Sequence, residues 1–214
     1  MRKAFSLIEL AVVITIIGLL TATIQAGIGV VKSAQTRALV GQLKEYKSSY
    51  YGFFSAYSGF PGDLGNASYL WSSAVNGDGD GLVEYVSGDS TEEFANTWTH
   101  LALGDFISSD YPALSYPEAR DDIMKYIIIY YSDIHSQSGN SITIQANDFS
   151  GVMTPLEAYQ LDCKIDDCSP TIGTTSIDNG DGITGSTTTC LNVSGELNSK
   201  DVHTDECRVI MWLD

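Results

Sequence analysis

A run of 21 residues without a charge, from Ala11 to Val31, constrains this chain more than any other feature. Ile, Val, Leu, Ala, Gly and Thr make up most of the run, and about 20 such residues form a helix long enough to cross a bilayer. Glu9 stands two positions before Ala11. A carboxylate at the edge of hydrocarbon is costly unless it is paired or reaches the lipid headgroups. The sequence therefore predicts a long apolar N-terminal helix in which Glu9 requires an explanation.

Three interpretations compete for residues 1–31. A secretory signal peptide fits poorly, because cleavage after Ala26 leaves Ile24 at the minus-three position, where a small residue is needed. A plain membrane anchor explains the length of the run but gives Glu9 no role. Lys and Arg residues lie on both sides of the run, so their distribution does not orient such an anchor firmly.

The third interpretation is a resemblance. The residues "RKAFSLIEL" resemble the processing site of type IV prepilins and type II secretion pseudopilins, in which a short basic leader precedes F-[ST]-L-I-E and an apolar helix. The resemblance implies that a prepilin peptidase cuts between Ala4 and Phe5 and methylates the new amine of Phe5, so that residues 1–4 are a leader. The family strongly prefers Gly at the position of Ala4, and this departure implies slower processing.

The resemblance also implies a role for Glu9. In a filament, its carboxylate would pair with the Phe5 amine of a neighbouring subunit. This pair would stabilise one axial register between subunits. Within its own chain, Glu9 lies in the first helical turn, where the positive end of the helix dipole favours an acid. The alternative is that Glu9 reaches the cytoplasmic headgroups.

Residues 32–57 continue the helix. They contain no proline and place apolar side chains at three- and four-residue steps, which predicts an amphipathic extension. Gly59, Pro61 and Gly62 then end it. We therefore expect a spine helix over residues 5–57 and a globular head over residues 58–214. The segment "FPGDL" also occurs in many pilin-like sequences just after the spine helix, which extends the resemblance.

The segment "NGDGDGLVEY" carries the first half of a calcium-loop pattern, with Asn76, Asp78 and Asp80 at alternate positions. The second half is missing, because Ser87 stands where an EF-hand has its bidentate Glu. A calcium ion would have to recruit other acids, namely Glu84, Asp89, Glu92 or Glu93. Some secretion pseudopilins resemble this arrangement in holding calcium beside the sheet. The alternative is a solvated Asp-Gly turn.

Four cysteines lie in the last quarter of the chain, which is typical of two disulfides formed in an oxidising compartment. Four cysteines permit three pairings. The pairs Cys163–Cys168 and Cys190–Cys207 close the shortest loops, but the sequence does not decide among the three. The segment "AYQLDCKIDDCSP" resembles an A-x-x-[IL]-D-x-K-[IL]-D-D-G-x-P pattern of bacterial pilin-like proteins, with Cys168 where glycine is usual.

The head has the signals of a small antiparallel sheet and short helices. Residues 125–132 and 141–145 are rich in β-branched and aromatic side chains and predict a hairpin whose loop contains Gly139 and Asn140. The C-terminal "CRVIMWL" predicts a third strand. Helices are predicted after Ser90 and after Thr154, because each of these residues has a Glu three positions later. Residues 176–189 form a further Asp/Gly cluster in which Asp178 and Asp181 are able to hold a cation, but the pattern favours two tight turns. The expected class is α+β with a type IV pilin-like layout.

Function is expected to be structural. The chain contains no G-x-S-x-G, H-E-x-x-H or Walker motif, its three histidines stand apart, and adjacent acids such as Asp166 and Asp167 are typical of a solvated surface, so we expect no enzyme. The formal net charge of −16 disfavours nucleic acid.

The resemblance therefore leads us to expect a pilus or pseudopilus subunit. Its partners would be itself or other pilins, prepilin peptidase, the bacterial inner membrane and the pilus assembly machinery. It would be an inner-membrane precursor first and a periplasmic or surface filament later. The alternative is a tethered or secreted calcium-binding adhesin or binding module that does not polymerise.

Overall fold

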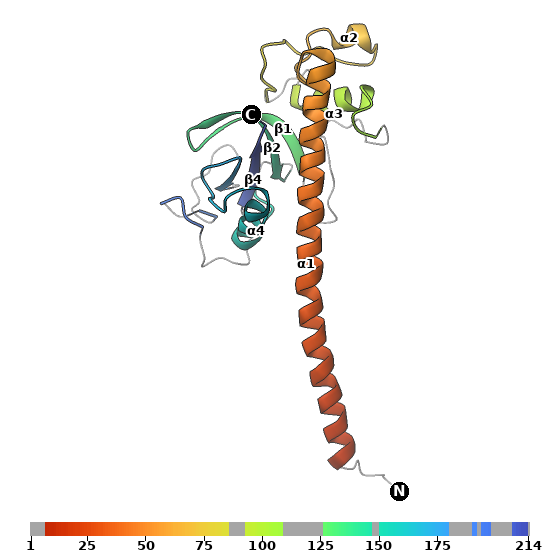
Figure 1. The fold of residues 1–214 in the computed structure, drawn as a ribbon, viewed down its shortest axis with the longest axis vertical. Coiled ribbons are helices and arrows are strands. Elements are labelled where there is room, and N and C mark those ends of the chain that lie inside the picture. Colours follow the sequence, from red (N-terminus) through yellow and green to blue (C-terminus); the bar gives the residue numbers. More distant parts are fainter. Residues whose placement is uncertain are drawn as a thin grey trace. The chain divides into compact units, whose positions relative to one another are not determined.

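The computed structural model describes residues 7–85, 93–108, 126–146, 150–179, 190–191, 194–197 and 207–213. Along the chain, the helices and strands are α1 (Leu7–Tyr57), α2 (Ala67–Leu70), α3 (Glu93–Leu103), β1 (Tyr126–Ile134), β2 (Gln137–Gln145), α4 (Pro155–Ile165), β3 (Thr175–Asn179) and β4 (Cys207–Trp212) (Figure 1). A long N-terminal helix is thus followed by an antiparallel sheet and short helices. At this level the predicted α+β class is confirmed, and the layout is compatible with a pilin-like fold.

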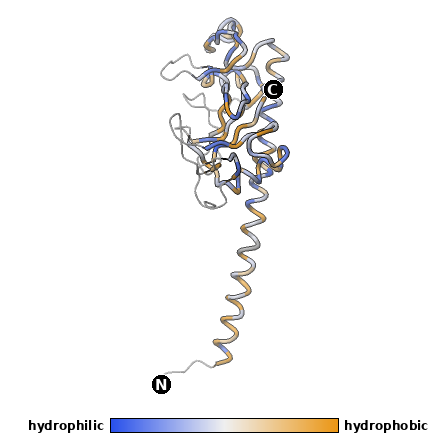
Figure 2. Tube along the Cα trace, turned by 90° about the vertical axis from the view of Figure 1, so that its left-hand side faces the viewer, coloured by the Kyte–Doolittle hydropathy of each residue, from blue (hydrophilic) through white to orange (hydrophobic). Residues whose placement is uncertain are grey.

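The chain divides into two compact units, Met1–Gly41 and Gln42–Asp214, and α1 belongs to both. In the first unit every described side chain from Leu7 to Val31 is exposed. Figure 2 shows hydrophobic residues recurring along this stretch. By length and composition, α1 is the one helix among the described residues that is apolar enough to cross a membrane. The predicted boundaries at 5–57 and 58–214 stay predictions.

In the second unit, α1 changes from an exposed helix to a core helix. Leu43, Tyr46, Tyr50 and Phe53 are buried and recur at three- and four-residue steps, as expected for one apolar face. Their partners lie on α3 and on the segment after α1: the rings of Tyr46 and Trp98 are 4.8 Å apart, those of Tyr50 and Phe60 5.1 Å, and those of Phe53 and His100 6.2 Å. Full burial of each such side chain contributes about 1.5–3 kcal/mol.

The sheet has the strand order β1-β2-β4-β3, and all neighbouring strands are antiparallel. The predicted hairpin is confirmed as β1 and β2, but the prediction that its loop contains Gly139 and Asn140 is wrong. The turn is instead His135 and Ser136, whose φ angles of 54° and 65° match the left-handed conformation favoured in two-residue hairpin turns. Asn140 lies in β2, where it pairs with Tyr131 of β1, and its side chain accepts from Val83 N and donates to Gly81 O.

The predicted third strand is confirmed as β4, whereas β3 was not predicted. Tight turns were expected from residue 176 onward, and for residues 176–179 that prediction is wrong, because these residues pair with β4. Polar side chains in β3 are satisfied by distant partners, so the strand is stable without an apolar pattern. Trp212 Nε1, for example, donates to Ser176 Oγ at 3.0 Å. Asp181 lies outside the described residues.

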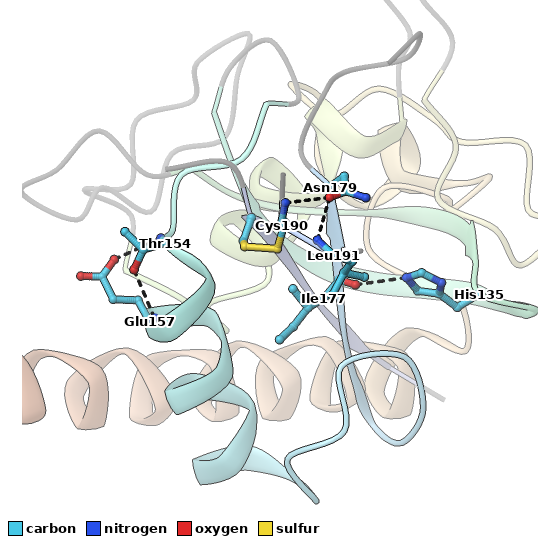
Figure 3. The surroundings of a disulfide bond; sticks show 8 residues. His135, Thr154, Glu157, Ile177, Asn179, Cys190 and Leu191 are labelled. Atoms are coloured by element: carbon cyan, nitrogen blue, oxygen red, sulfur yellow. Dashed lines mark hydrogen bonds between the residues drawn. A yellow bond between two sulfur atoms is a disulfide. The ribbon is translucent and has the colours of Figure 1, made fainter. Parts of the chain in front are cut away.

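The helix predicted after Thr154 is confirmed as α4, and so is its capping box. Thr154 Oγ1 accepts from Glu157 N, and Glu157 Oε2 accepts from Thr154 N, both at 3.3 Å, which is a complete capping box (Figure 3). Helix α3 begins at Glu93, and its predicted cap Ser90 lies outside the described residues.

Both disulfides in the structure close short loops, since Cys163 pairs with Cys168 and Cys190 pairs with Cys207. The Cys190–Cys207 disulfide links the first residue of β4 to Cys190, and a residue of β3 also contacts this segment. Cys190 N and Leu191 N both donate to Asn179 Oδ1 at 2.9 Å, beside this disulfide (Figure 3).

Candidate functional site

Glu9 lies in the first turn of α1, and its side chain is exposed among exposed apolar neighbours such as Leu7, Ile8 and Leu10. The position at the helix start agrees with the favourable dipole interaction expected from the sequence. Ala4 and Phe5 lie outside the described residues. Cleavage, methylation and the pairing of Glu9 with Phe5 of a neighbour therefore stay predictions.

Five carboxylates gather around the segment 76–84, which we call the acidic loop. Asp78 belongs to two groups, one with Asp63 and Glu93 and one with Asp80 and Glu84, and in each group one carboxylate oxygen per residue lies within 4.8 Å of the others. Asp63 and Glu93 are buried, whereas Asp78 and Asp80 are exposed. Carboxylate oxygens in such number are the ligands that Ca²⁺ prefers.

Asp63 and Glu93 also hold the backbone of the acidic loop. Asp63 accepts from Gly79 N at 2.6 Å and from Gly81 N at 3.0 Å, one bond to each carboxylate oxygen. Glu93 accepts from Asp78 N at 2.9 Å and from Glu84 N at 3.2 Å, again with both oxygens. The two buried acids are therefore structural clamps, whether or not a cation is bound.

Burial raises the pKa of Asp63 and of Glu93. In each case the backbone N–H groups that donate to the carboxylate oppose this rise, and nearby acids add to it: Asp80 and Asp78 raise the pKa of Asp63, while Asp63 and Asp78 raise that of Glu93. A cation close to these carboxylates would offset the desolvation cost of their burial and reduce the repulsion between them.

The structure brings together part of the predicted calcium set. Asp78, Asp80 and Glu84 form one group, and Glu93 joins Asp78 in the other. Asn76 has its Oδ1 occupied by Ser68 N, which donates to it at 2.8 Å. Glu92 and Asp89 lie outside the described residues. Calcium binding stays a prediction.

Asp63 was missing from the predicted set. The only local signal for it is an acid placed directly after the Pro-Gly pair that ends the spine helix. Its contact with residues 79 and 81 crosses 16 and 18 positions of sequence, respectively. Such a contact has no periodic signature.

His100 is buried and fixed in one tautomer. Gly62 N donates to Nδ1 at 2.9 Å, so Nδ1 carries no proton, and Nε2 donates to Val75 O at 2.9 Å. Burial lowers the pKa of His100, which keeps the ring neutral, although the bond to Val75 opposes the shift. Its contacts give it a structural role. His135 contacts Ile177 O at 3.1 Å (Figure 3), and His203 lies outside the described residues.

A third acidic group lies at the C-terminal end of α4. One carboxylate oxygen from each of Asp162, Asp166 and Asp167 lies within 4.8 Å of the others. The sequence predicts a solvated pair for Asp166 and Asp167 and does not single out Asp162. A signal for Asp162 exists in the pattern of α4, because it lies four residues after Ala158 and next to Leu161, at a position where the helix is buried.

Comparison with known proteins finds no matching family model, and neither a curated protein nor a solved structure matches the chain significantly. The fold and the sites described above therefore carry the functional argument.

Proposed function

We propose that this protein is a structural subunit of a type IV pilus-like or type II secretion pseudopilus filament. The observation that carries the proposal is the exposed apolar surface of α1 from Leu7 to Val31, which begins with the residues "LIEL". An apolar surface of this extent is stable in a bilayer or against other subunits, and not in water. A subunit that passes from membrane to filament uses the same surface twice.

Glu9 supports assembly rather than simple anchoring. A plain anchor has no need of a carboxylate at the edge of its apolar run, because the desolvation cost of the charge opposes the favourable interaction with the helix dipole. Cleavage before Phe5 would create a cationic amine four residues away in sequence, a suitable partner for Glu9 of an adjacent subunit. A charge left unpaired in an apolar environment is costly, and the attraction between two opposite charges grows as they approach, so the register that brings Glu9 and the amine together would be favoured.

Electron microscopy of sheared surface fractions tests this proposal in cells that carry pilus assembly genes. We expect filaments that contain the unaltered protein, and loss of the protein from filaments after Glu9→Ala, with membrane insertion and N-terminal processing retained. Glu9→Asp is the matched control, because it keeps the charge and should retain part of the assembly. Normal assembly of Glu9→Ala subunits would refute the role proposed for this charge.

Ala4 provides a second test, which acts on processing alone. The prepilin family prefers Gly at this position, so Ala4→Gly should accelerate removal of residues 1–4, and Ala4→Leu should block it. A pulse-chase experiment that separates the two forms of the chain measures the rate. Equal behaviour of all three proteins would show that no such peptidase acts here.

The alternative function is a tethered or secreted calcium-binding module that does not polymerise, and the acidic loop is the feature that favours it. This alternative predicts a chain that is uncleaved, or one that begins near Gly27, together with no filament. The N-terminus of the mature protein therefore discriminates between the two functions.

A further inference from the structure

We propose that the C-terminal end of α4 is a second divalent-cation site, with Asp162, Asp166 and Asp167 as its ligands. Asp162 lies in the last turn of α4, Asp166 is the C-cap, and Asp167 follows it. The carboxylate oxygens of this group lie within 4.8 Å of one another, as described above. Three carboxylates at the negative end of a helix repel one another and the helix dipole, so the arrangement favours a bound cation.

The buried carboxylate of Asp162 is an independent sign of a missing partner. Asp162 is 0% exposed, and its Oδ1 accepts from the hydroxyl of Thr175 on β3. Its Oδ2 is also buried and has no hydrogen-bond partner among the residues that the structure describes. An unpartnered carboxylate oxygen in the interior is costly, so a cation or a proton must complete it.

The other two acids keep ligand capacity while they hold the backbone. Asp166 Oδ2 accepts from Thr174 N and Thr175 N, and Asp167 Oδ1 accepts from Ser169 N at 2.9 Å. The second oxygen of each carboxylate has no hydrogen bond within the described part of the chain. Each of the three carboxylates thus retains an oxygen with no hydrogen bond in this part of the structure, and one oxygen from each lies within 4.8 Å of the other two.

Covalent and steric features position these ligands in advance. The Cys163–Cys168 disulfide closes a loop that contains Asp166 and Asp167 and starts directly after Asp162. Gly173 has a φ of 105°, and a Cβ there would overlap Asp166 Oδ2, so only glycine lets this carboxylate reach the 173–175 backbone. A site ordered before binding loses little entropy when the ion enters.

The donor set selects the kind of ion. All three ligands are hard oxygen donors, which suit Ca²⁺ or Mg²⁺ and not Zn²⁺ or copper. Asp167 is exposed, so water can fill further coordination positions. Ca²⁺ tolerates irregular geometry with six to eight oxygens, whereas Mg²⁺ demands a near-ideal octahedron, so we infer that calcium is the preferred ion. The site is separate in sequence from the acidic loop, and the inference does not depend on filament assembly.

Reduction of the Cys163–Cys168 disulfide reports on this site specifically. The full chain in detergent micelles is stripped with EDTA, and dithiothreitol is then added with and without CaCl₂. Alkylation and mass spectrometry follow each disulfide separately. If the ion must leave before the loop opens to the thiol, calcium at ten times its dissociation constant slows the reduction about tenfold. Cys190–Cys207 is the internal control and should change little. MgCl₂ should protect less than CaCl₂.

Matched variants assign the effect to named residues. Asp167→Asn keeps an oxygen for Ser169 N and is exposed, so it should fold, and it should raise the calcium concentration for half-maximal protection about tenfold or more. Asp162→Asn should do the same, and if it fails to fold, Asp167→Asn decides alone. Asp78→Asn in the acidic loop is the control and should leave protection unchanged.

The proposal is overturned if calcium leaves the reduction rate of Cys163–Cys168 unchanged, which would mean that a proton alone completes Asp162. It is equally overturned if Asp167→Asn is protected as well as the unaltered protein. If calcium no longer protects Asp78→Asn but still protects Asp167→Asn, the calcium effect belongs to the acidic loop instead.

Discussion

Replacing His100 by Phe should destabilise the Gln42–Asp214 unit by about 2 to 4 kcal/mol. The substitution keeps an aromatic ring, which can still stack on Phe53, so little cavity forms. It removes both hydrogen bonds of the imidazole and leaves Gly62 N–H and Val75 C=O without their partner. A buried polar group left unpaired costs about 1 to 3 kcal/mol, and the Val75 contact is only partly buried, which limits the sum.

The same substitution should change the pH dependence of stability. Burial lowers the pKa of His100, so the folded protein favours the neutral ring, and protonation of Nδ1 would break the bond from Gly62. His100 therefore contributes stability above the ordinary His pKa of about 6.5, and that contribution is lost as the pH falls from there through the lower folded pKa. The difference in unfolding free energy between the unaltered protein and His100→Phe should shrink on acidification by at most about 1.4 kcal/mol per pH unit. Asp63 and Glu93 have raised pKa values in both proteins, so their effect largely cancels.

Urea unfolding in detergent micelles, followed by tryptophan fluorescence from about pH 5 to pH 7.5, measures both effects. All three tryptophans lie in the Gln42–Asp214 unit, so the signal reports on its unfolding. His100→Gln is the control, because its amide nitrogen can replace the donor to Val75, and it should cost about half as much. A cost below about 1 kcal/mol, or a difference that does not vary with pH, would refute the role assigned to His100.

Replacing Cys190–Cys207 with a pair of alanines should cost about 3 kcal/mol and replacing Cys163–Cys168 about 2 kcal/mol, because stabilisation grows with loop length and the cysteines are 17 and 5 residues apart. Urea unfolding measures both, and a larger cost for the shorter loop would contradict the argument. Thr154→Ala should cost about 1 kcal/mol through loss of the cap on α4, with Thr154→Ser nearly neutral, and an equal cost for both would exclude the capping role. Gly77→Ala should lower the melting temperature strongly, because a Cβ there would overlap the chain's own backbone, whereas Gly41→Ala meets nothing within 4 Å in the described structure and should stabilise α1 by up to about 1 kcal/mol.

Elements specified by local sequence could be predicted. Helix α1 follows from its apolar pattern without proline, α4 from the capping box at Thr154 and Glu157, and β4 from its run of β-branched and aromatic residues. Strand β3 could not be predicted, because Thr175 and Ser176 are buried polar residues whose partners lie on α4 and β4. The information that makes them a strand is not in their neighbours in sequence.

The acidic groups likewise contain some residues that the local sequence predicts and others that it does not. The alternating acids Asp78 and Asp80 were evident from their spacing, since a turn of this kind is encoded locally. Asp63 was not, because it is placed by the backbone of the acidic loop, and for Asp162 the helical spacing indicates only a buried position, while its partner Thr175 is set by tertiary contact. A buried acid gains its role from distant partners, which a spacing rule does not detect.

The intact mass of the protein purified from membranes of cells that contain prepilin peptidase tests the proposed function most directly. We predict a chain that begins at Phe5 with a methylated amine, because the Glu9 partner exists only after the bond between Ala4 and Phe5 is cut. A chain that retains Met1, or one that begins near Gly27, would contradict the proposal that this protein is a pilin-like subunit.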